Sequence, residues 1–504
     1  MGLYDFTFYD LIERNAVIFG NHPAWFEAEE ERAITFSQTK EMVDRLAAGL
    51  QHRGIQKGDR IAVFGQNSLE YFLLYGAAAA LGAVMLPLNW RLSAPEAVAN
   101  INDCRPVLLF VDPAFQDTIS GIRDQLTSVQ TCYSLGTDKG DFEEMTPLLE
   151  DDHPLRPENV SGNDGFVIIH TAAVAGKPRG ALLSHDNLMC ANLVLNFGLN
   201  LNAADVHLNL LPLFHVGGLF MATNCFQAGV QNINMRKFDA QKAVALIEQF
   251  QVSVLFDFSP ILSNILEAGK GSGKDLSSLR AVMGLDTPDV IEAYQDLTNG
   301  TFYSLYGQTE TSCVVTMGPY NDRPGSAGRP IPLAMVQLVD DKDVPVSKGE
   351  VGEIVVKGPM VFQGYWHLPE DNAKTFRGGW HHTGDLGRLD PDGYLWYAGR
   401  KAEKELIKPG GENVYPAEVE KVILQHPAIE KTAVIGVPDP KWKEGIKAVC
   451  QLKSGETLTP EALILFVGER IARYKKPQYV AFVDEMPMTA EGDIDRKKVK
   501  ETYG

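Results

Sequence analysis

The chain has 504 residues, of which 45% are hydrophobic, 22% charged and 9% aromatic, a composition that excludes disordered and fibrous proteins. Lys and Arg total 46 against 65 for Asp and Glu, giving a formal charge of −19. A surface of this sign repels nucleic acid and anionic membranes, so any anionic ligand requires a local site.

Two features of the sequence bear on the location of the protein in the cell. The six cysteines are isolated, with no CxxC pair, and the first residues lack a basic segment followed by an apolar run, so we expect no targeting signal and a cytoplasmic protein. The uncharged stretch Tyr71 to Leu88 is long enough to raise the question of a membrane span. Because Gly82 and Pro87 interrupt it, we interpret it as a buried helix followed by a buried strand.

Further along the chain, the pattern of apolar residues changes twice. Over residues 35–285, short apolar runs alternate with longer helical ones, which predicts parallel sheets covered by helices. After Arg323, short β-rich pieces with turns indicate a β subdomain. The charged segment Lys401-Ala-Glu-Lys-Glu405 precedes new strand and helix signals. We therefore predict an α/β fold with a large N-terminal domain, residues 1–400, and a small mobile α+β C-terminal domain, residues 401–504.

The first segment with the chemistry of a phosphate site is the small-residue loop 170–180. It follows an apolar strand, so its backbone N–H groups can approach phosphate oxygens, and Lys177 and Arg179 add positive charge. It is not a Walker A loop, because Pro178 stands where Ser or Thr is required. Read alone, a tight structural turn explains this segment equally well.

Two later segments each place a carboxylate beside glycine and threonine. Segment 303–311 contains Glu310, and a carboxylate there can hold Mg²⁺ bridged to phosphates. Segment 379–387 contains Asp385, which can accept two hydrogen bonds from a ribose diol. For either acid taken alone, a role in a turn or a helix cap is an equal alternative.

The order and spacing of these three segments, together with Gly410-Gly-Glu-Asn-Val-Tyr-Pro416, resemble the adenylate-forming superfamily, which includes acyl-CoA synthetases, peptide-synthetase adenylation domains and firefly luciferase. The resemblance covers nearly the whole chain and includes Pro212-Leu-Phe-His-Val-Gly-Gly218 and Gly364-Tyr-Trp366. It implies ATP, Mg²⁺ and coenzyme A as cofactors. It also implies two half-reactions: a carboxylate attacks the α-phosphate of ATP to give an acyl-adenylate, and a thiol then displaces AMP.

The resemblance also implies roles for individual residues. Tyr306 would stack on adenine, Thr309 would contact the α-phosphate, Glu310 would carry Mg²⁺, and Asp385 and Arg400 would hold the ribose. The expected nucleotide-binding set is Thr171, Lys177, Arg179, Gly284, Tyr306, Gly307, Thr309, Asp385 and Arg400. The expected catalytic set is Thr171, His215, Glu310 and Lys404. The expected acyl pocket is His215, Gly217, Gly218, Met221 and Phe258, and the CoA side is Gly410 and Gly411. For His215, a core histidine is the alternative.

The sequence departs from the family pattern at four places, one of which is the hinge segment Gly399 to Lys408, two residues longer than usual. Residues 172–175 lack the usual hydroxyl side chains of the phosphate loop, which removes hydrogen-bond donors to the phosphates. Leu285 and Asp286 alter the adenine loop, so only Gly284 is carried over there. In the family, a lysine near the C-terminus bridges the carboxylate and the α-phosphate in the first half-reaction. Asp493 stands at that position here, and its negative charge is unsuited to binding two anions. We expect a lysine of the unusually long hinge segment to substitute, and the candidates are Lys401, Lys404 at the pivot, and Lys408.

The sequence thus predicts an AMP-forming acyl-CoA synthetase. Its mainly apolar pocket candidates, which include Phe220 and Met283, favour a medium-chain, alicyclic or aromatic acid, although Asp257 keeps an amino-acid substrate open. Loading of a phosphopantetheinyl carrier protein and a non-catalytic acyl-CoA-binding or nucleotide-binding homologue are the alternatives. We expect a carboxylic acid of small-molecule type and CoA as partners, with no nucleic acid and no membrane span, and a homodimer is compatible with the sequence.

Overall fold

The computed structural model describes residues 4–136, 138–174, 177–400, 406–412, 414–440, 442–489 and 494–504, leaving aside the side chains of 172–174, 177, 178 and 411. The contacts divide the chain into two compact units. The first consists of Met1–Trp90, Ile101–Ile169 and Gly180–Gly399. The second consists of Arg91–Asn100, His170–Arg179 and Arg400–Gly504. Two short segments of the predicted N-terminal domain, Arg91–Asn100 and His170–Arg179, thus belong to the second unit.

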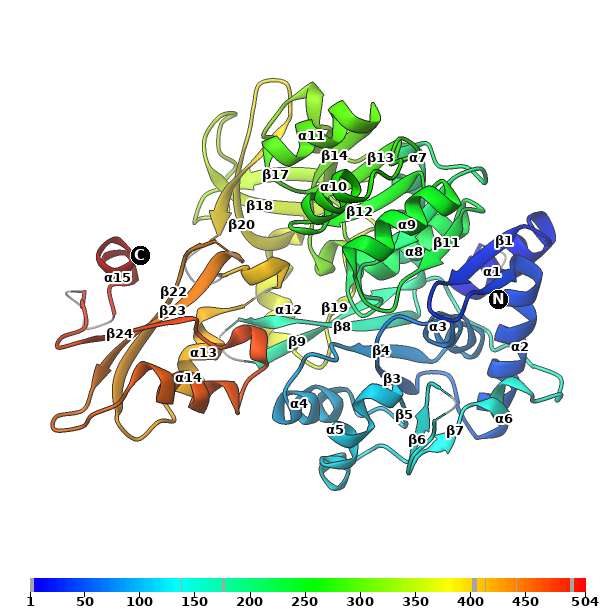
Figure 1. Ribbon diagram of the computed structural model, residues 1–504, viewed down its shortest axis with the longest axis horizontal. Coiled ribbons are helices and arrows are strands. Elements are labelled where there is room, and N and C mark those ends of the chain that lie inside the picture. The colour runs from blue at the N-terminus through cyan, green and yellow to red at the C-terminus, as the bar shows by residue number, and fades with distance from the viewer. Residues whose placement is uncertain are drawn as a thin grey trace. The chain divides into compact units, whose positions relative to one another are not determined.

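Two large sheets, mainly of parallel strands, form the body of the fold (Figure 1). The nine-stranded sheet has the order β16-β15-β14-β13-β12-β10-β11-β1-β2. Its strands are β1 (Pro23–Glu27), β2 (Arg32–Thr35), β10 (Val206–Asn209), β11 (Gln231–Asn234), β12 (Val254–Phe258), β13 (Ala281–Leu285), β14 (Thr301–Tyr306), β15 (Thr316–Pro319) and β16 (Arg329–Pro330). The eight-stranded sheet has the order β19-β9-β8-β4-β3-β5-β6-β7. Its strands are β3 (Arg60–Phe64), β4 (Val84–Leu88), β5 (Leu108–Val111), β6 (Thr131–Ser134), β7 (Glu143–Glu144), β8 (Gly165–Val174), β9 (Lys177–Ser184) and β19 (Gly364–Tyr365).

Helices pack on these sheets, as the alternating apolar runs predict. They are α1 (Phe8–Ile18), α2 (Phe36–His52), α3 (Leu69–Leu81), α4 (Ala94–Cys104), α5 (Gln116–Ser120), α6 (Thr146–Leu149), α7 (His185–Leu199), α8 (Val216–Gln227), α9 (Ala240–Phe250), α10 (Ile261–Ser272), α11 (Pro288–Thr298) and α12 (Pro369–Thr375). The Phe8 ring of α1 lies against Phe72 of α3, Phe166 of β8 and Phe226 of α8. Aromatic packing therefore joins helices and a strand from distant parts of the sequence into one core.

The uncharged stretch from Tyr71 to Leu88 forms a helix and then a strand, which confirms its interpretation from the sequence. Ser68 caps the N-terminus of α3 by accepting the Tyr71 N–H, and Gly82 ends the helix with a left-handed φ of 64°. Every residue of α3 except Glu70 is buried, which accounts for its apolar composition on all sides. Among the described helices, none is long and apolar enough to cross a membrane.

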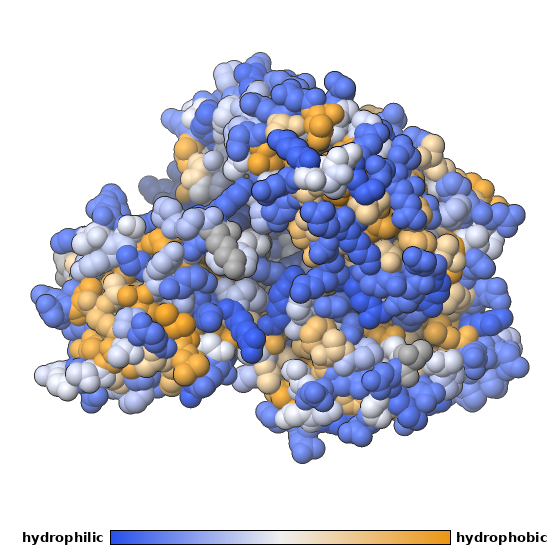
Figure 2. Space-filling model, viewed as in Figure 1, coloured by the Kyte–Doolittle hydropathy of each residue, from blue (hydrophilic) through white to orange (hydrophobic). Residues whose placement is uncertain are grey.

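The remaining sheets confirm the predicted β subdomain and the α+β character of the C-terminal part. An antiparallel sheet follows Arg323 and consists of β17 (Met335–Val339), β18 (Gly352–Lys357), β20 (His381–Leu389) and β21 (Leu395–Arg400). The second unit contains β22 (Ile429–Asp439), β23 (Lys443–Leu452), β24 (Tyr479–Val483), α13 (Pro416–Ile423), α14 (Pro460–Gly468) and α15 (Arg496–Tyr503). Figure 2 shows apolar side chains at the surface around α13 and α14, and Leu424 and Leu465 are among the exposed residues of this unit.

His207 of β10 is a core histidine that links stability to pH. Its Nδ1 lies 2.7 Å from Asn232 Oδ1, and burial lowers its pKa to about 4. The unfolded chain, with an ordinary histidine pKa of about 6.5, binds more protons than the folded chain between those two values. The folding contribution of His207 is therefore complete above pH 6.5 and lost as the pH falls toward 4.

We expect a His207→Gln variant to lose less stability than the wild type between pH 6.5 and pH 4. The slopes of unfolding free energy against pH should differ by about 1.4 kcal/mol per pH unit. Urea unfolding at several pH values measures both slopes. Equal slopes for the two proteins would mean that His207 titrates normally in the folded chain.

Candidate active site

Four neighbouring strands of the nine-stranded sheet place the predicted residues at one edge. β10, β12, β13 and β14 run parallel to one another. Tyr306 ends β14, Phe258 ends β12, and His215 stands in the segment after β10. The carboxyl ends of parallel strands lie at the same edge of a sheet, which is the usual position of ligand sites in such folds.

Asp385 of β20 joins the antiparallel subdomain to this edge. Its side chain is 1% exposed. The Tyr306 hydroxyl donates a hydrogen bond of 2.8 Å to Asp385 Oδ2, and Gln308 Nε2 donates one of 2.6 Å to the same oxygen. The orientation of the carboxylate is therefore fixed by two neutral donors from the segment that carries Glu310. His381 supports this arrangement, because its Nε2 lies 3.3 Å from Gln308 Oε1.

Glu310 lies in a short 3₁₀ turn, Thr309–Thr311, directly after β14. Its side chain is 8% exposed, and the Tyr365 hydroxyl of β19 donates a hydrogen bond of 2.8 Å to its Oε1. Within the described part of the chain, no hydrogen bond to Oε2 occurs. An oriented carboxylate with such an oxygen has the donor chemistry that Mg²⁺ prefers.

Gln308, Tyr365 and His381 are site residues that the sequence reasoning missed. Gln308 stands between Tyr306 and Glu310, so its position in that segment was the available signal. Tyr365 belongs to the Gly364-Tyr-Trp366 motif, which is part of the family resemblance but did not predict a role for this tyrosine. The Tyr365 hydroxyl hydrogen-bonds to Glu310, which is 55 residues away in the sequence, and the Tyr306 hydroxyl hydrogen-bonds to Asp385, which is 79 residues away.

Two glycines near the sheet edge allow close backbone approach. A Cβ atom at Gly307 would lie 1.9 Å from the Cys313 carbonyl oxygen. A Cβ atom at Gly284 would lie 2.0 Å from the Asp257 carbonyl oxygen. Both distances are far inside van der Waals contact, so only glycine fits these positions.

The two glycines at the start of α8 have different surroundings. A Cβ atom at Gly217 would lie 3.3 Å from the Phe256 ring and 3.4 Å from the Phe258 ring. At Gly218 it would lie 2.2 Å from the Pro212 carbonyl oxygen. Gly217 therefore lies beside aromatic side chains of β12, whereas Gly218 lets α8 pack against the preceding loop.

The other pocket candidates divide into partly exposed and buried side chains. His215 and Phe258 are partly exposed, and the His215 ring centroid is 4.5 Å from that of Phe214. Met221, Phe220 and Met283 are buried in the core. Asp257, the residue that left an amino-acid substrate as an alternative because its carboxylate could bind an amino group, is also buried. Its Oδ1 accepts the Leu262 N–H at the start of α10. That contact gives Asp257 a role in capping the helix.

The second unit holds the remaining predicted residues. Thr171 Oγ1 donates to the Arg179 carbonyl oxygen over 3.3 Å, and Arg400 Nη1 donates to the Tyr415 hydroxyl over 3.2 Å. Gly410 has a left-handed φ of 58°, and a Cβ atom there would lie 2.8 Å from the Trp442 ring, so both conformation and space favour glycine.

Some predicted residues are outside this description. Lys401, Lys404 and Asp493 lie outside the described residues, and only the backbone is described for Lys177 and Gly411. Of the three lysines considered as substitutes for the family lysine, Lys408 is described. Its side chain is exposed, and its backbone N–H donates to Glu444 Oε2 over 2.7 Å.

Comparison with known proteins covers both parts of the chain. A model of the AMP-binding enzyme family matches residues 12–366, and a model of the AMP-binding enzyme C-terminal domain matches residues 418–493. An indoleacetate–CoA ligase from Aromatoleum aromaticum is 36% identical over 480 residues, 94% of this chain and 93% of the relative. A feruloyl-CoA synthase from an Amycolatopsis species is 34% identical and covers 94% of each chain. The solved structure of an o-succinylbenzoate CoA synthetase from Bacillus subtilis has a TM-score of 0.87 and 26% identity, covering 97% of this chain and 98% of that one.

Proposed function

The chain belongs to the AMP-binding enzyme family and is an AMP-forming acid–CoA ligase, and from this premise we propose that its substrate is an aromatic or alicyclic carboxylic acid. The relatives named above act on indoleacetate, ferulate and o-succinylbenzoate, each of which contains an aromatic ring. Gly217 lies beside the rings of Phe256 and Phe258, and the partly exposed Phe258 offers an apolar side chain against which a substrate ring can pack.

The two half-reactions follow from the chemistry of the acyl group. A carboxylate oxygen attacks the α-phosphorus of ATP, the bond to the pyrophosphate oxygen breaks, and the carbonyl carbon gains AMP as a good leaving group. The CoA sulfur then attacks that carbon, the bond to the AMP oxygen breaks, and the thiol proton is released. ATP and CoA are thus the substrates, and Mg²⁺ belongs to the proposal.

We assign the nucleotide to the carboxyl edge around Asp385. Two donors hold one of its oxygens, which orients the carboxylate toward a ribose diol. Glu310 is the proposed ligand of Mg²⁺, and the ion would neutralise charge on the phosphates. Gly284 and Gly307, which let the backbone pack against the Asp257 and Cys313 carbonyls, are proposed beside the adenine together with Tyr306. Thr309 is proposed at the α-phosphate.

The remaining roles are those that the family resemblance implies. Thr171, Lys177 and Arg179 are proposed at the phosphates, with Arg400 at the ribose. His215 and Met221 are proposed at the acyl group, and Gly410 and Gly411 on the CoA side. A mobile C-terminal domain from residue 401, a cytoplasmic location and a homodimer also belong to this proposal. The six cysteines are buried and form no disulfide among the described residues, which agrees with a reducing compartment.

The observation that carries the proposal is the Tyr306–Asp385–Gln308 arrangement beside Glu310 at one sheet edge. The direct test is release of AMP and pyrophosphate from Mg-ATP across aromatic, alicyclic and medium-chain acids, each with CoA, with a phosphopantetheinyl carrier protein, or with neither. We expect CoA-dependent AMP release with ring-containing acids. Turnover only with straight-chain acids, or only with the carrier protein, would overturn the proposed substrate or acceptor.

Alanine at the two glycines of α8 separates substrate contact from packing. Gly217→Ala brings a methyl group to the edge of the Phe256 and Phe258 rings, so we expect a loss of about 10-fold in kcat/KM for the bulkiest accepted acid, with little change for the smallest. Gly218→Ala forces a methyl group against the Pro212 carbonyl and should lower the melting temperature instead. Kinetics across an acid series and thermal unfolding measure the two effects. A uniform loss across all acids in Gly217→Ala would contradict a specificity role.

The hinge lysines are our proposed replacement for the family lysine. We expect combined Lys401→Ala, Lys404→Ala and Lys408→Ala changes to slow adenylate formation about 100-fold, since a cation that bridges two anions contributes on the order of 3 kcal/mol to the transition state. Thioester formation from synthetic acyl-adenylate should persist. Single-turnover assays of each half-reaction measure this. Unchanged adenylate formation in the triple variant would sink the hypothesis, and the single variants identify the lysine.

A further inference from the structure

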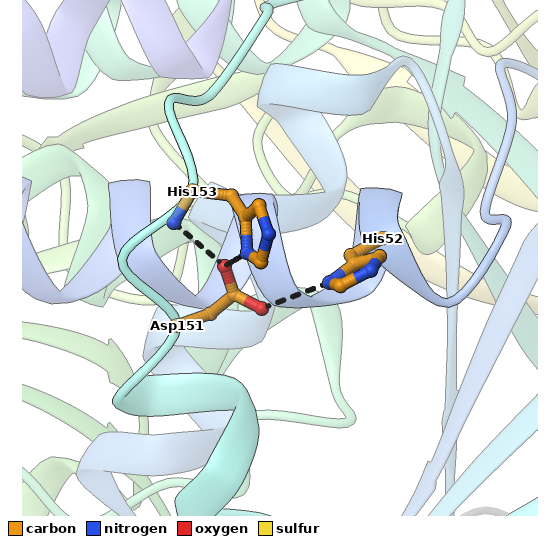
Figure 3. Close-up of side chains that lie close together, drawn as sticks. All are labelled: His52, Asp151 and His153. Carbon is orange, nitrogen blue, oxygen red and sulfur yellow. Dashed lines mark hydrogen bonds and ion pairs between the residues drawn. The ribbon is translucent and has the colours of Figure 1, made fainter.

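Two histidines and an aspartate gather on the surface of the first unit, and none of them belongs to the proposed nucleotide or acyl site. His52 is the last residue of α2, whereas Asp151 and His153 follow α6, about a hundred positions later in the sequence. Figure 3 shows the two imidazole rings next to each other, with centroids 4.3 Å apart, and each ring has a nitrogen directed toward a different oxygen of the Asp151 carboxylate. Packing of α2 against α6 brings the segments together.

The spacing of the three side chains matches the coordination shell of a small cation. His153 Nδ1 lies 2.8 Å from Asp151 Oδ1, and His52 Nδ1 lies 3.4 Å from Asp151 Oδ2. One ligand atom from each residue lies within 4.8 Å of the others. In a tetrahedral site with metal–ligand bonds of about 2.0–2.1 Å, neighbouring ligand atoms are about 3.3 Å apart. Small side-chain movements therefore suffice to form such a shell.

Burial and hydrogen bonding favour the same interpretation. The Asp151 side chain is 12% exposed, and the His153 backbone N–H donates to its Oδ1 over 2.9 Å, which fixes the carboxylate. The histidine side chains are 58% and 59% exposed, so a cation from solution can reach them and retain a water molecule. His52 also stands at the C-terminal end of α2, where the helix dipole favours positive charge.

We propose that His52, Asp151 and His153 form a surface site for a divalent transition cation of the Zn²⁺ type, which links the end of α2 to the segment after α6. Two imidazoles and one carboxylate select Zn²⁺ over Mg²⁺ and Ca²⁺, which prefer oxygen ligands alone. A second group of the first unit, Asp343, Glu353 and His382, differs because Arg377 donates to both carboxylates and already supplies the positive charge.

The test is calorimetric titration of the full chain, free of any affinity tag, with ZnCl₂ in the absence of nucleotide. The variants are His52→Gln, His153→Gln and Asp151→Asn, and the matched control is His22→Gln, a histidine of the same unit that belongs to neither group. Thermal unfolding without metal checks that each variant is folded. Co²⁺ serves as a second probe, because its visible absorption reports tetrahedral coordination.

We expect one Zn²⁺ to bind to the wild type and to His22→Gln, with affinity at least 10-fold weaker in each of the three site variants. Zn²⁺ should raise the melting temperature of the wild type and of His22→Gln, and it should not raise that of the three site variants. Excess Mg²⁺ should not displace it. Absence of binding to the wild type, or equal affinity in all five proteins, would overturn the proposal, and neither result bears on the ligase activity.

Discussion

Glu310→Gln is expected to lower the rate of adenylate formation by about 100- to 1,000-fold, because a charge that binds a catalytic cation contributes several kcal/mol to the transition state. Glutamine has the same size and can still accept the Tyr365 hydroxyl, so the change removes charge and leaves packing intact. Single-turnover formation of acyl-adenylate, measured over a range of Mg²⁺ concentrations, gives both the rate and the apparent metal affinity. We expect both to fall.

Two companion variants make this result specific. Glu370→Gln removes an exposed carboxylate in the first turn of α12 and should leave adenylate formation unchanged. Tyr365→Phe keeps the carboxylate but loses the hydrogen bond that orients it, so an intermediate loss of about 10-fold is expected. Thioester formation from synthetic acyl-adenylate should proceed in Glu310→Gln. If both half-reactions fell equally, Glu310 would have a structural role instead.

Asp385→Asn is expected to lower kcat/KM for ATP by about 10- to 100-fold, because a hydrogen bond to a charged group contributes about 1.5–3 kcal/mol. Tyr306 and Gln308 both donate to Oδ2, so the asparagine should turn its carbonyl oxygen toward them. Its amide group then faces the ribose and cannot accept the hydroxyl protons. The KM for CoA should change little.

Deoxy nucleotides locate the effect at the ribose. The wild type should prefer ATP to 2′-deoxy-ATP by about 10-fold, the worth of one such hydrogen bond. In Asp385→Asn this preference should fall toward unity, because the variant offers no carboxylate acceptor to either nucleotide. Steady-state kinetics with each nucleotide measure the two ratios. A preference retained in full by the variant would exclude Asp385 from ribose binding.

Local patterns in the sequence were sufficient to predict the main helices and strands of the fold. Gly82 provides a left-handed helix end that only a few residue types adopt readily, so the helix and strand within residues 71–88 could be predicted. The alternation of apolar runs predicted the parallel sheets, and the change after Arg323 predicted the antiparallel subdomain. The motifs predicted the family because their residue types and order depend on nothing beyond the chain itself.

The contacts that build the site required the tertiary structure. Tyr365 reaches Glu310 across 55 residues, Tyr306 reaches Asp385 across 79, and His52 meets Asp151 across 99. Strand register and helix packing bring these pairs together, and a local apolar period carries no information about them. The same holds for Gly218, whose need for glycine comes from the approach of the Pro212 carbonyl. The sequence by itself determined the family, the elements and the chemistry available, whereas packing between distant segments decided which donor meets each carboxylate.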